Sequence, residues 1–305
     1  MLLGIAAKIV STLLFAGMQA LVKFYSAYPI AELVFFRSAF ALVVLVIWLL
    51  MRGDFPRALY TNWFSGHLVR SIAGVGSMFL LFAAYGLLPL ADVAAISYAG
   101  PLIIVVLAAL LLREKVNAGR WAAVCLGFAG VIVMLWEHLG AGLRSANAIG
   151  ALCAFGGASL VAMAMIQTRR LTRSEDTGAI VFYFQGTTTL VGLAIILLAE
   201  IWPVEWWLGP LVSSQAWVWP EASHWWPLIC TGLLGGAAQI FMTQSYRLTD
   251  ASIVACFDYT SMIWALLIGV VIFGELPTPI ALIGAGIIAS GGLLAIFSER
   301  AARKA

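Results

Sequence analysis

Ten long apolar segments dominate this sequence and limit the folds that it can adopt. A helix that crosses a bilayer needs about 20 mainly apolar residues. The 305-residue chain is 63% hydrophobic and only 10% charged, whereas soluble domains carry about 25% charged residues. The sequence therefore excludes a soluble fold and predicts an all-α polytopic protein of the lipid bilayer, with ten transmembrane helices. The predicted spans are 2–24, 31–51, 67–88, 91–112, 120–137, 147–168, 178–200, 226–246, 250–273 and 279–298.

Positive charge alternates between the two sides of this predicted bundle. The even-numbered connections and the C-terminus hold thirteen Lys and Arg residues, including Arg70, and the odd-numbered connections hold two, Lys23 and Arg144. Positively charged loops stay in the cytoplasm. We therefore expect a bacterial inner-membrane protein with both termini cytoplasmic, in which Lys8, near the inner end of its helix, extends to the interface.

An internal repeat relates the two halves of the chain. A shift of 161 positions aligns Gly74 with Gly235, Tyr98 with Tyr259 and Glu114 with Glu275, among other identities. Each half, 1–146 and 147–305, holds five predicted helices. Because five is odd, two such units in tandem enter the membrane from opposite faces. Inverted repeats of this kind are associated with alternating access around a site at the membrane midplane.

The pattern of the fourth and fifth segments resembles a known family. The fourth runs from Tyr98 through Pro101 and Leu102 to Glu114, the fifth contains Gly127 and Gly130, and the second begins with the stretch from Phe35 to Arg37. Together these features resemble the drug/metabolite transporter superfamily, EamA type, and within it the amino-acid and metabolite exporters such as those for aromatic amino acids. The resemblance implies a cavity bounded by helices 1 to 4 and 6 to 9. Met262 stands at the repeat position of Pro101, which departs from the pattern.

Two ionisable residues inside the predicted spans are candidates for function, because charges in the bilayer are costly and are kept for a purpose. Asp258 lies near the midplane and could contact protons or a substrate ammonium group, or could cap a helix break. Arg37 could bind a substrate carboxylate through its planar guanidinium. It could also form a structural ion pair with Glu32 or Asp92, which is the interpretation that we favour.

Uncharged polar residues fall in stripes on several predicted helices. Such stripes must face other helices or water, because lipid cannot satisfy them. They predict an amphipathic central cavity, and Tyr98 and Tyr259 are placed by the repeat on opposite walls. The alternative is hydrogen bonding between helices, worth only about 0.6 kcal/mol per contact. The candidate lining residues are Gln19, Ser97, Tyr98, Met163, Tyr183, Gln239, Thr243, Tyr259 and Trp264.

Segments 120–137 and 279–298 are rich in Gly and Ala and nearly free of polar atoms. Small residues let helices approach closely, so we expect these two to form a peripheral pair or a dimer contact. Gly232 and Gly236 form a GxxxG pattern that we also interpret as packing. The six tryptophans of the connection 201–225 predict an interfacial belt, with a ligand-stacking cage as the alternative.

The sequence contains no phosphate-binding GxxxxGK[ST] loop and no HExxH or GxSxG motif, so we expect no catalysis, no cofactor, no metal and no nucleic acid partner. We predict a secondary transporter, monomer or homodimer, that exports amino acids or related small metabolites, with protons as the candidate coupling ion. The alternatives are an uncoupled facilitator, a drug or cation exporter, and a membrane-embedded enzyme that acts on lipid-linked substrates.

Overall fold

Helices account for the regular structure throughout the described part of the chain. The computed structural model describes residues 2–111, 118–139, 145–171, 174–201, 217–248, 257 and 260–304. Its helices, one of them the short 3-10 helix η1, are α1 (Leu2–Phe24), α2 (Ile30–Arg52), η1 (Arg57–Leu59), α3 (Phe64–Leu87), α4 (Leu90–Ser97), α5 (Ala99–Leu111), α6 (Ala118–Leu139), α7 (Ala146–Leu171), α8 (Thr177–Ile201), α10 (Trp225–Leu248), α12 (Thr260–Phe273) and α13 (Pro279–Lys304).

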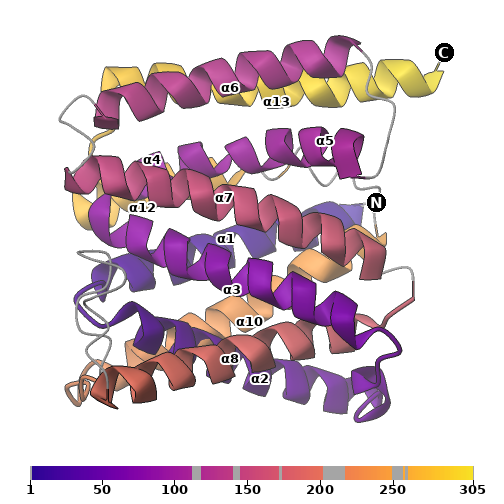
Figure 1. Cartoon of the computed structure of the whole chain (residues 1–305), viewed down its shortest axis with the longest axis vertical. Coiled ribbons are helices and arrows are strands. Elements are labelled where there is room, and N and C mark those ends of the chain that lie inside the picture. Colours follow the sequence, from indigo (N-terminus) through magenta and orange to yellow (C-terminus); the bar gives the residue numbers. More distant parts are fainter. Residues whose placement is uncertain are drawn as a thin grey trace.

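Nine of the ten predicted spans overlap one of these helices, or α4 and α5 together, over most of their length. The predicted span 250–273 overlaps α12 over 260–273, and its first part lies almost entirely outside the described residues. Seven stretches are long and apolar enough to cross a membrane, and Trp121–Val133, Thr260–Phe273 and Pro279–Gly291 are shorter apolar helices. The helices lie roughly side by side, and α1 begins at the end of the bundle where α13 finishes (Figure 1). The described chain is thus a polytopic helical bundle.

The fourth span is broken at Tyr98, between α4 and α5. Pro101, three residues later, has no backbone N–H that could donate to the Ser97 carbonyl. The Tyr98 amide instead donates to the Ala95 carbonyl at 3.1 Å, a tighter turn than an α-helix makes. The break therefore places Tyr98 at a junction inside the bundle.

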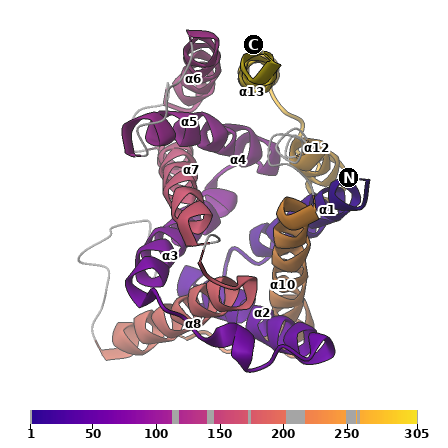
Figure 2. The same ribbon diagram turned by 90° about the vertical axis from the view of Figure 1, so that its right-hand side faces the viewer.

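Eight helical units close into a ring. Following the contacts, α1 packs on α10, α10 on α2, α2 on α8, α8 on α3, α3 on α7, α7 on α4, α4 on α12, and α12 returns to α1. Figure 2 shows this ring with the helices seen nearly along their axes, and α6 and α13 standing outside it. The ring contains the helices that the family resemblance implies as cavity walls.

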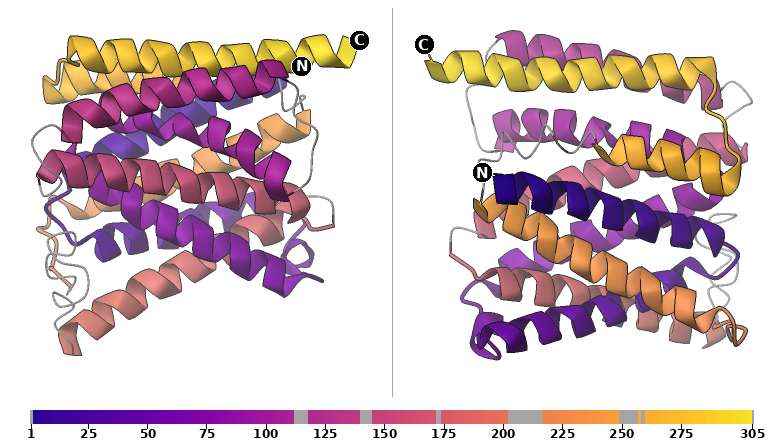
Figure 3. Two further views of the ribbon diagram at one scale, coloured as in Figure 1. Left: turned by 45° about the horizontal axis from the view of Figure 1, so that its top comes forward. Right: turned by 180° about the vertical axis from the view of Figure 1, so that it is seen from behind.

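The pair α6 and α13 is joined by small residues, as predicted. A methyl group on Gly130 would lie 2.7 Å from the Gly284 carbonyl oxygen, and one on Gly291 would lie 2.7 Å from the Gly127 nitrogen. Figure 3 shows the two helices side by side from both directions. The peripheral pair is confirmed. The Gly232 and Gly236 motif is likewise a packing contact, because methyl groups there would meet the α2 backbone at Phe36 and Ala41.

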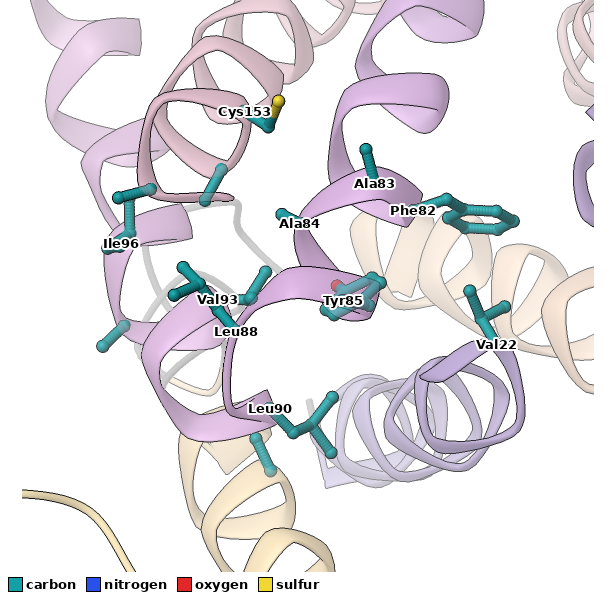
Figure 4. Packing of buried hydrophobic residues seen from close by; sticks show 14 of the residues in the cluster. Val22, Phe82, Ala83, Ala84, Tyr85, Leu88, Leu90, Val93, Ile96 and Cys153 are labelled. Atoms are coloured by element: carbon teal, nitrogen blue, oxygen red, sulfur yellow. The ribbon is translucent and has the colours of Figure 1, made fainter. Parts of the chain in front are cut away.

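The largest apolar cluster lies where α3 ends and α4 begins. Tyr85, Leu88, Leu90, Val93 and Ile96 are buried there, and Figure 4 shows them between the neighbouring helices. Full burial of such a side chain is worth about 1.5–3 kcal/mol. This cluster fixes the α3–α4 connection and, with it, the position of Tyr98.

Two expectations for single residues need correction. Arg70, counted above as a loop charge, is only 7% exposed and lies inside the bundle on α3, and Lys8 is buried rather than extended to the interface. Of the six tryptophans of the predicted interfacial belt, Trp202, Trp206 and Trp207 lie outside the described residues. Trp219 is 78% exposed, but Trp217 and Trp225 pack against Phe36 of α2, with ring centroids 5.8 and 5.6 Å away.

Candidate functional site

Tyr98 joins the two halves of the chain at the α4–α5 break. Its hydroxyl lies 2.5 Å from the Ser261 Oγ and accepts a hydrogen bond of 3.0 Å from the Met262 amide. Met262 is the repeat position of Pro101, so the break of the first half lies against the corresponding position of the second. The neighbouring candidate, Ser97, donates to the Val93 carbonyl of its own helix.

Trp264 belongs to the same junction. Its indole Nε1 donates to the Thr12 Oγ1 at 3.3 Å, and that oxygen is also 2.8 Å from the Thr260 Oγ1. Tyr98, Thr12 and Trp264 therefore connect α1, the α4–α5 break and the start of α12 through hydroxyl groups. Asp258 and Tyr259 lie outside the described residues, directly before this helix.

Arg37 does not form the ion pair that we favoured from the sequence. Its Nη1 donates to the Gln185 Oε1 of α8 at 2.8 Å, and its guanidinium lies 5.8 Å from the centroid of the Phe184 ring. Within the described residues it forms no ion pair, with Glu32, Asp92 or any other carboxylate. Glu32 accepts instead from the Val218 amide.

Arg70 meets Arg37 on the same aromatic ring. Its guanidinium lies 4.3 Å from the Phe184 centroid, and its Nε donates to the Thr168 Oγ1 at 2.9 Å. The two guanidinium groups are close enough for their charges to repel each other. An arginine over an aromatic face gains cation–π attraction, about 2 kcal/mol or more when desolvated.

Three buried donor atoms of this group have no acceptor among the described residues. They are the Arg37 Nε, the Arg70 Nη1 and the Gln185 Nε2. Arg37 is 5%, Arg70 7% and Gln185 0% exposed. A buried unsatisfied group costs about 1–3 kcal/mol, and more when it is charged. We call Arg37, Arg70, Phe184 and Gln185 the arginine cluster. Its free donors and its positive charge are groups that can accept an anion.

The remaining candidate residues are spread over the ring. Gln239 is buried, and its backbone carbonyl accepts from the Thr243 hydroxyl. It lies one turn from Gly235, where a methyl group would be 3.2 Å from the Arg37 Nε. The Tyr183 ring packs against the His67 ring in a tilted arrangement, with centroids 4.8 Å apart. Gln19 is half-buried, and Met163 is 47% exposed.

A pocket lies away from these residues, at the ends of α2 and α10. It has a volume of about 470 Å³ and is lined by Trp48, Arg52, Gln244 and Leu248. Its Arg52 already pairs with Asp54 at 3.0 Å and lies over the Trp48 ring. The charge in this pocket is therefore satisfied within the protein, unlike that of the arginine cluster.

Polar contacts close both ends of the bundle. At one end, Lys23 of α1 pairs with Glu275 at 2.9 Å, and Glu275 accepts from the Leu90 amide of α4. At the other, Glu175, between α7 and α8, accepts from the Asn62 amide and lies 3.3 Å from the His67 Nε2. Each contact joins a residue of one half to a residue of the other.

Sequence reasoning missed Arg70, Phe184 and Gln185 as site residues. Arg70 stands only three residues inside the predicted span 67–88, so its charge was assigned to the adjoining connection. Gln185 is a polar residue within the predicted span 178–200, and this was the available signal. Phe184 gave none, because one aromatic residue among many in an apolar helix is uninformative.

The chain is similar to known transporters over nearly its whole length. A model of the EamA-like transporter family matches residues 1–136 and 148–297. The pseudopaline exporter CntI of Pseudomonas aeruginosa is 29% identical over 289 residues, which cover 93% of each chain. A riboflavin transporter of Brucella anthropi is 28% identical over 251 residues, 82% of each chain. An S-adenosylmethionine uptake transporter of Rickettsia prowazekii is 25% identical over 269 residues, 88% of this chain and 83% of the relative.

A solved crystal structure has the same fold. It superposes with a TM-score of 0.67 at 23% sequence identity, and the match covers 97% of this chain and 96% of the other. At this identity the likeness is one of fold alone.

Proposed function

The chain belongs to the EamA-like transporter family of the drug/metabolite transporter superfamily and is therefore a multi-pass membrane transporter; we propose that it is an inner-membrane secondary carrier that works by alternating access of two inverted halves. In this proposal residues 1–146 and 147–305 form the halves. The substrate is an amino acid or a related small metabolite, and the direction is outward.

One observation carries the proposal: the helix packing keeps its pattern when the two halves are exchanged. The exchange turns the α10–α2 contact into α3–α8 and the α5–α7 contact into α12–α1, and all four are present. The contacts α3–α7 and α1–α10 likewise exchange with each other. Because each half has five spans, a twofold relation of this kind supports inverted repeats.

Two glycines related by the repeat support the same relation. A methyl group on Gly74 of α3 would lie 2.5 Å from the Phe184 ring of α8, and one on Gly235 of α10 would lie 3.2 Å from the Arg37 Nε of α2. In each half, a glycine of the third helix leaves room for a large side chain from the second helix of the opposite half.

The arginine cluster bears on the kind of substrate. Two buried positive charges oppose the entry of a cation, which weighs against the drug or cation exporter. The relative named as a pseudopaline exporter supports outward transport. Another relative is named as an uptake transporter, so the direction needs its own measurement.

The test is flux into proteoliposomes that contain the purified chain. We expect labelled amino acids to exchange across the membrane faster than in empty liposomes, and a pH gradient to drive their accumulation. Asp258→Asn should abolish the gradient-driven accumulation but keep exchange. If flux through both the parent and Asp258→Asn is insensitive to pH, an uncoupled facilitator is favoured. No flux for any amino acid would remove the proposed substrate class.

A further inference from the structure

We propose that the arginine cluster binds the transported substrate, and that this substrate is a small organic dianion with two carboxylate groups. The inference rests on the proposed carrier function. It adds the charge of the substrate and the residues that bind its charged groups. Arg70, Phe184 and Gln185 join Arg37 in this site.

The positive charge of the arginine cluster is not balanced by a carboxylate among the described residues. Arg37 and Arg70 are both more than nine-tenths buried, and neither forms an ion pair within the described part of the chain. Buried charges in proteins are as a rule paired. Glu175, on the connection between α7 and α8, is engaged with His67 and the Asn62 amide instead.

The arginine cluster also has hydrogen-bond donors to spare. The Arg37 Nε, the Arg70 Nη1 and the Gln185 Nε2 are buried and lack acceptors among the described residues. Guanidinium groups match carboxylates in geometry and form the strongest class of protein hydrogen bond with them. Negatively charged oxygen atoms, such as those of a carboxylate, would therefore satisfy these donors best.

The Phe184 ring sets the positions of the two guanidinium groups. This one ring contacts both guanidinium groups, at 5.8 and 4.3 Å from its centroid, so they are held at a fixed spacing despite their repulsion. The side chains come from α2, α3 and α8, which include helices of both halves. A ligand held here would feel any movement of one half against the other, as alternating access requires.

The two guanidinium charges of Arg37 and Arg70 are both compensated only by a ligand with two negative charges. A zwitterionic amino acid brings no net charge and would leave both guanidinium charges uncompensated. A monoanion would compensate one, and a dicarboxylate would compensate both. The proposed substrate class is therefore a dicarboxylate or an acidic amino-acid derivative of net negative charge.

The test uses the full chain in detergent, with succinate as the probe and its neutral diamide, succinamide, as the matched control. Succinate should raise the melting temperature, and succinamide should not. Arg37→Gln and Arg70→Gln should each weaken succinate binding about tenfold or more. Arg57→Gln, at an exposed arginine in η1, should leave binding unchanged.

Gln185→Glu provides a variant that does not depend on loss of stability. The new carboxylate would lie beside Arg37 and supply the missing negative charge from within. We expect the ligand-free variant to melt at a higher temperature than the parent, and succinate binding to be lost. Arg37→Lys and Arg70→Lys keep the charge and serve if a Gln variant fails to fold; they should bind succinate more weakly than the parent.

Several results would overturn the inference. These are equal shifts with succinate and succinamide, binding that survives every Arg variant, or a shift that chloride alone saturates so that succinate adds nothing. Succinate binding without any flux in proteoliposomes would instead remove the carrier function and leave the site. Flux of neutral amino acids that ignores the arginine variants would leave the carrier and remove the site.

Discussion

At the scale of single residues, Phe184 is the side chain that organises the arginine cluster. It lies against Gly74 of α3, where a methyl group would be 2.5 Å from its ring. The position of the ring therefore depends on the absence of a side chain at residue 74, and both guanidinium groups depend on the ring.

Gly74→Ala should push the Phe184 ring aside. Overpacking of this kind costs about 1–3 kcal/mol, and we expect a lower melting temperature together with weaker succinate binding. Gly186→Ala, also on α8, is the matched control, because a methyl group there meets nothing within 4 Å. Equal succinate affinity in Gly74→Ala and the parent would contradict the role of the ring.

Glu175 gives the structure a defined pH dependence. Burial would raise its pKa, but hydrogen bonds from Thr61, His67 and the Asn62 amide outweigh burial and hold the pKa below the ordinary 4.5. A carboxyl whose pKa is lower in the folded state stabilises the protein above the unfolded value and loses this contribution as the pH falls through the folded value.

Melting curves from pH 7 downward check this sign. The parent should lose stability more steeply than Glu175→Gln below about pH 4.5, the ordinary carboxyl value. Above that pH the parent should be the more stable of the two. Parallel curves over the whole range would show that the contact between Glu175 and His67 contributes nothing.

The failed pair of Arg37 with Glu32 shows where residue-scale reasoning from the sequence goes wrong. The two lie five positions apart on α2, which at about 100° per residue sets their side chains about 140° apart around the helix. The sequence places Arg37 and Glu32 at similar depths in the membrane, but the ion pair also requires both side chains to point in the same direction around the axis of α2. The true partner, Gln185, is 148 positions away, and no local pattern announces it.

At the scale of elements, the pair α6 and α13 contributes to stability from outside the ring that contains the arginine cluster. The two helices stand outside the ring (Figure 2) and contact each other through glycines. Their composition sufficed to predict this pairing, because small residues without polar atoms serve close packing and little else in a membrane.

Gly130→Ala should lower the melting temperature and leave succinate affinity unchanged. The added methyl group would be 2.7 Å from the Gly284 carbonyl oxygen and 2.8 Å from the Ile288 nitrogen, and backbone atoms cannot move aside as a side chain can. Gly286→Ala on α13 is the control, since its methyl group meets nothing within 4 Å. A loss of affinity in Gly130→Ala would mean that the pair supports the site.

The α4–α5 break is the element that connects the halves, through the Tyr98 hydroxyl. Tyr98→Phe removes its hydrogen bonds to Ser261 and Met262, each worth about 0.5–1.5 kcal/mol. We expect a lower melting temperature and an altered exchange rate in proteoliposomes. Ser97→Ala removes a hydroxyl that, among the described residues, bonds within its own helix, and it should change both less. Equal effects of the two changes would contradict a connecting role for Tyr98.

At the scale of the whole molecule, the ten spans follow from the sequence because the length and composition of each apolar segment are local properties. The arginine cluster does not follow, because it joins α2, α3 and α8 at positions set by helix rotation and tilt. The repeat lies between these cases: its offset of 161 positions is visible in the sequence, and the packing of α2, α3, α8 and α10 agrees with it.

The central claim is that the two halves run through the membrane in opposite directions, and sided labelling of thiols tests it most directly. Lys115 and Leu276 are repeat positions of each other, and Leu276 is 79% exposed. Each is changed to Cys in a cysteine-free background and treated with an impermeant maleimide in intact cells and in inverted vesicles. We predict that Leu276→Cys reacts in cells and Lys115→Cys only in inverted vesicles. Reaction of both from the same side would contradict the inverted architecture.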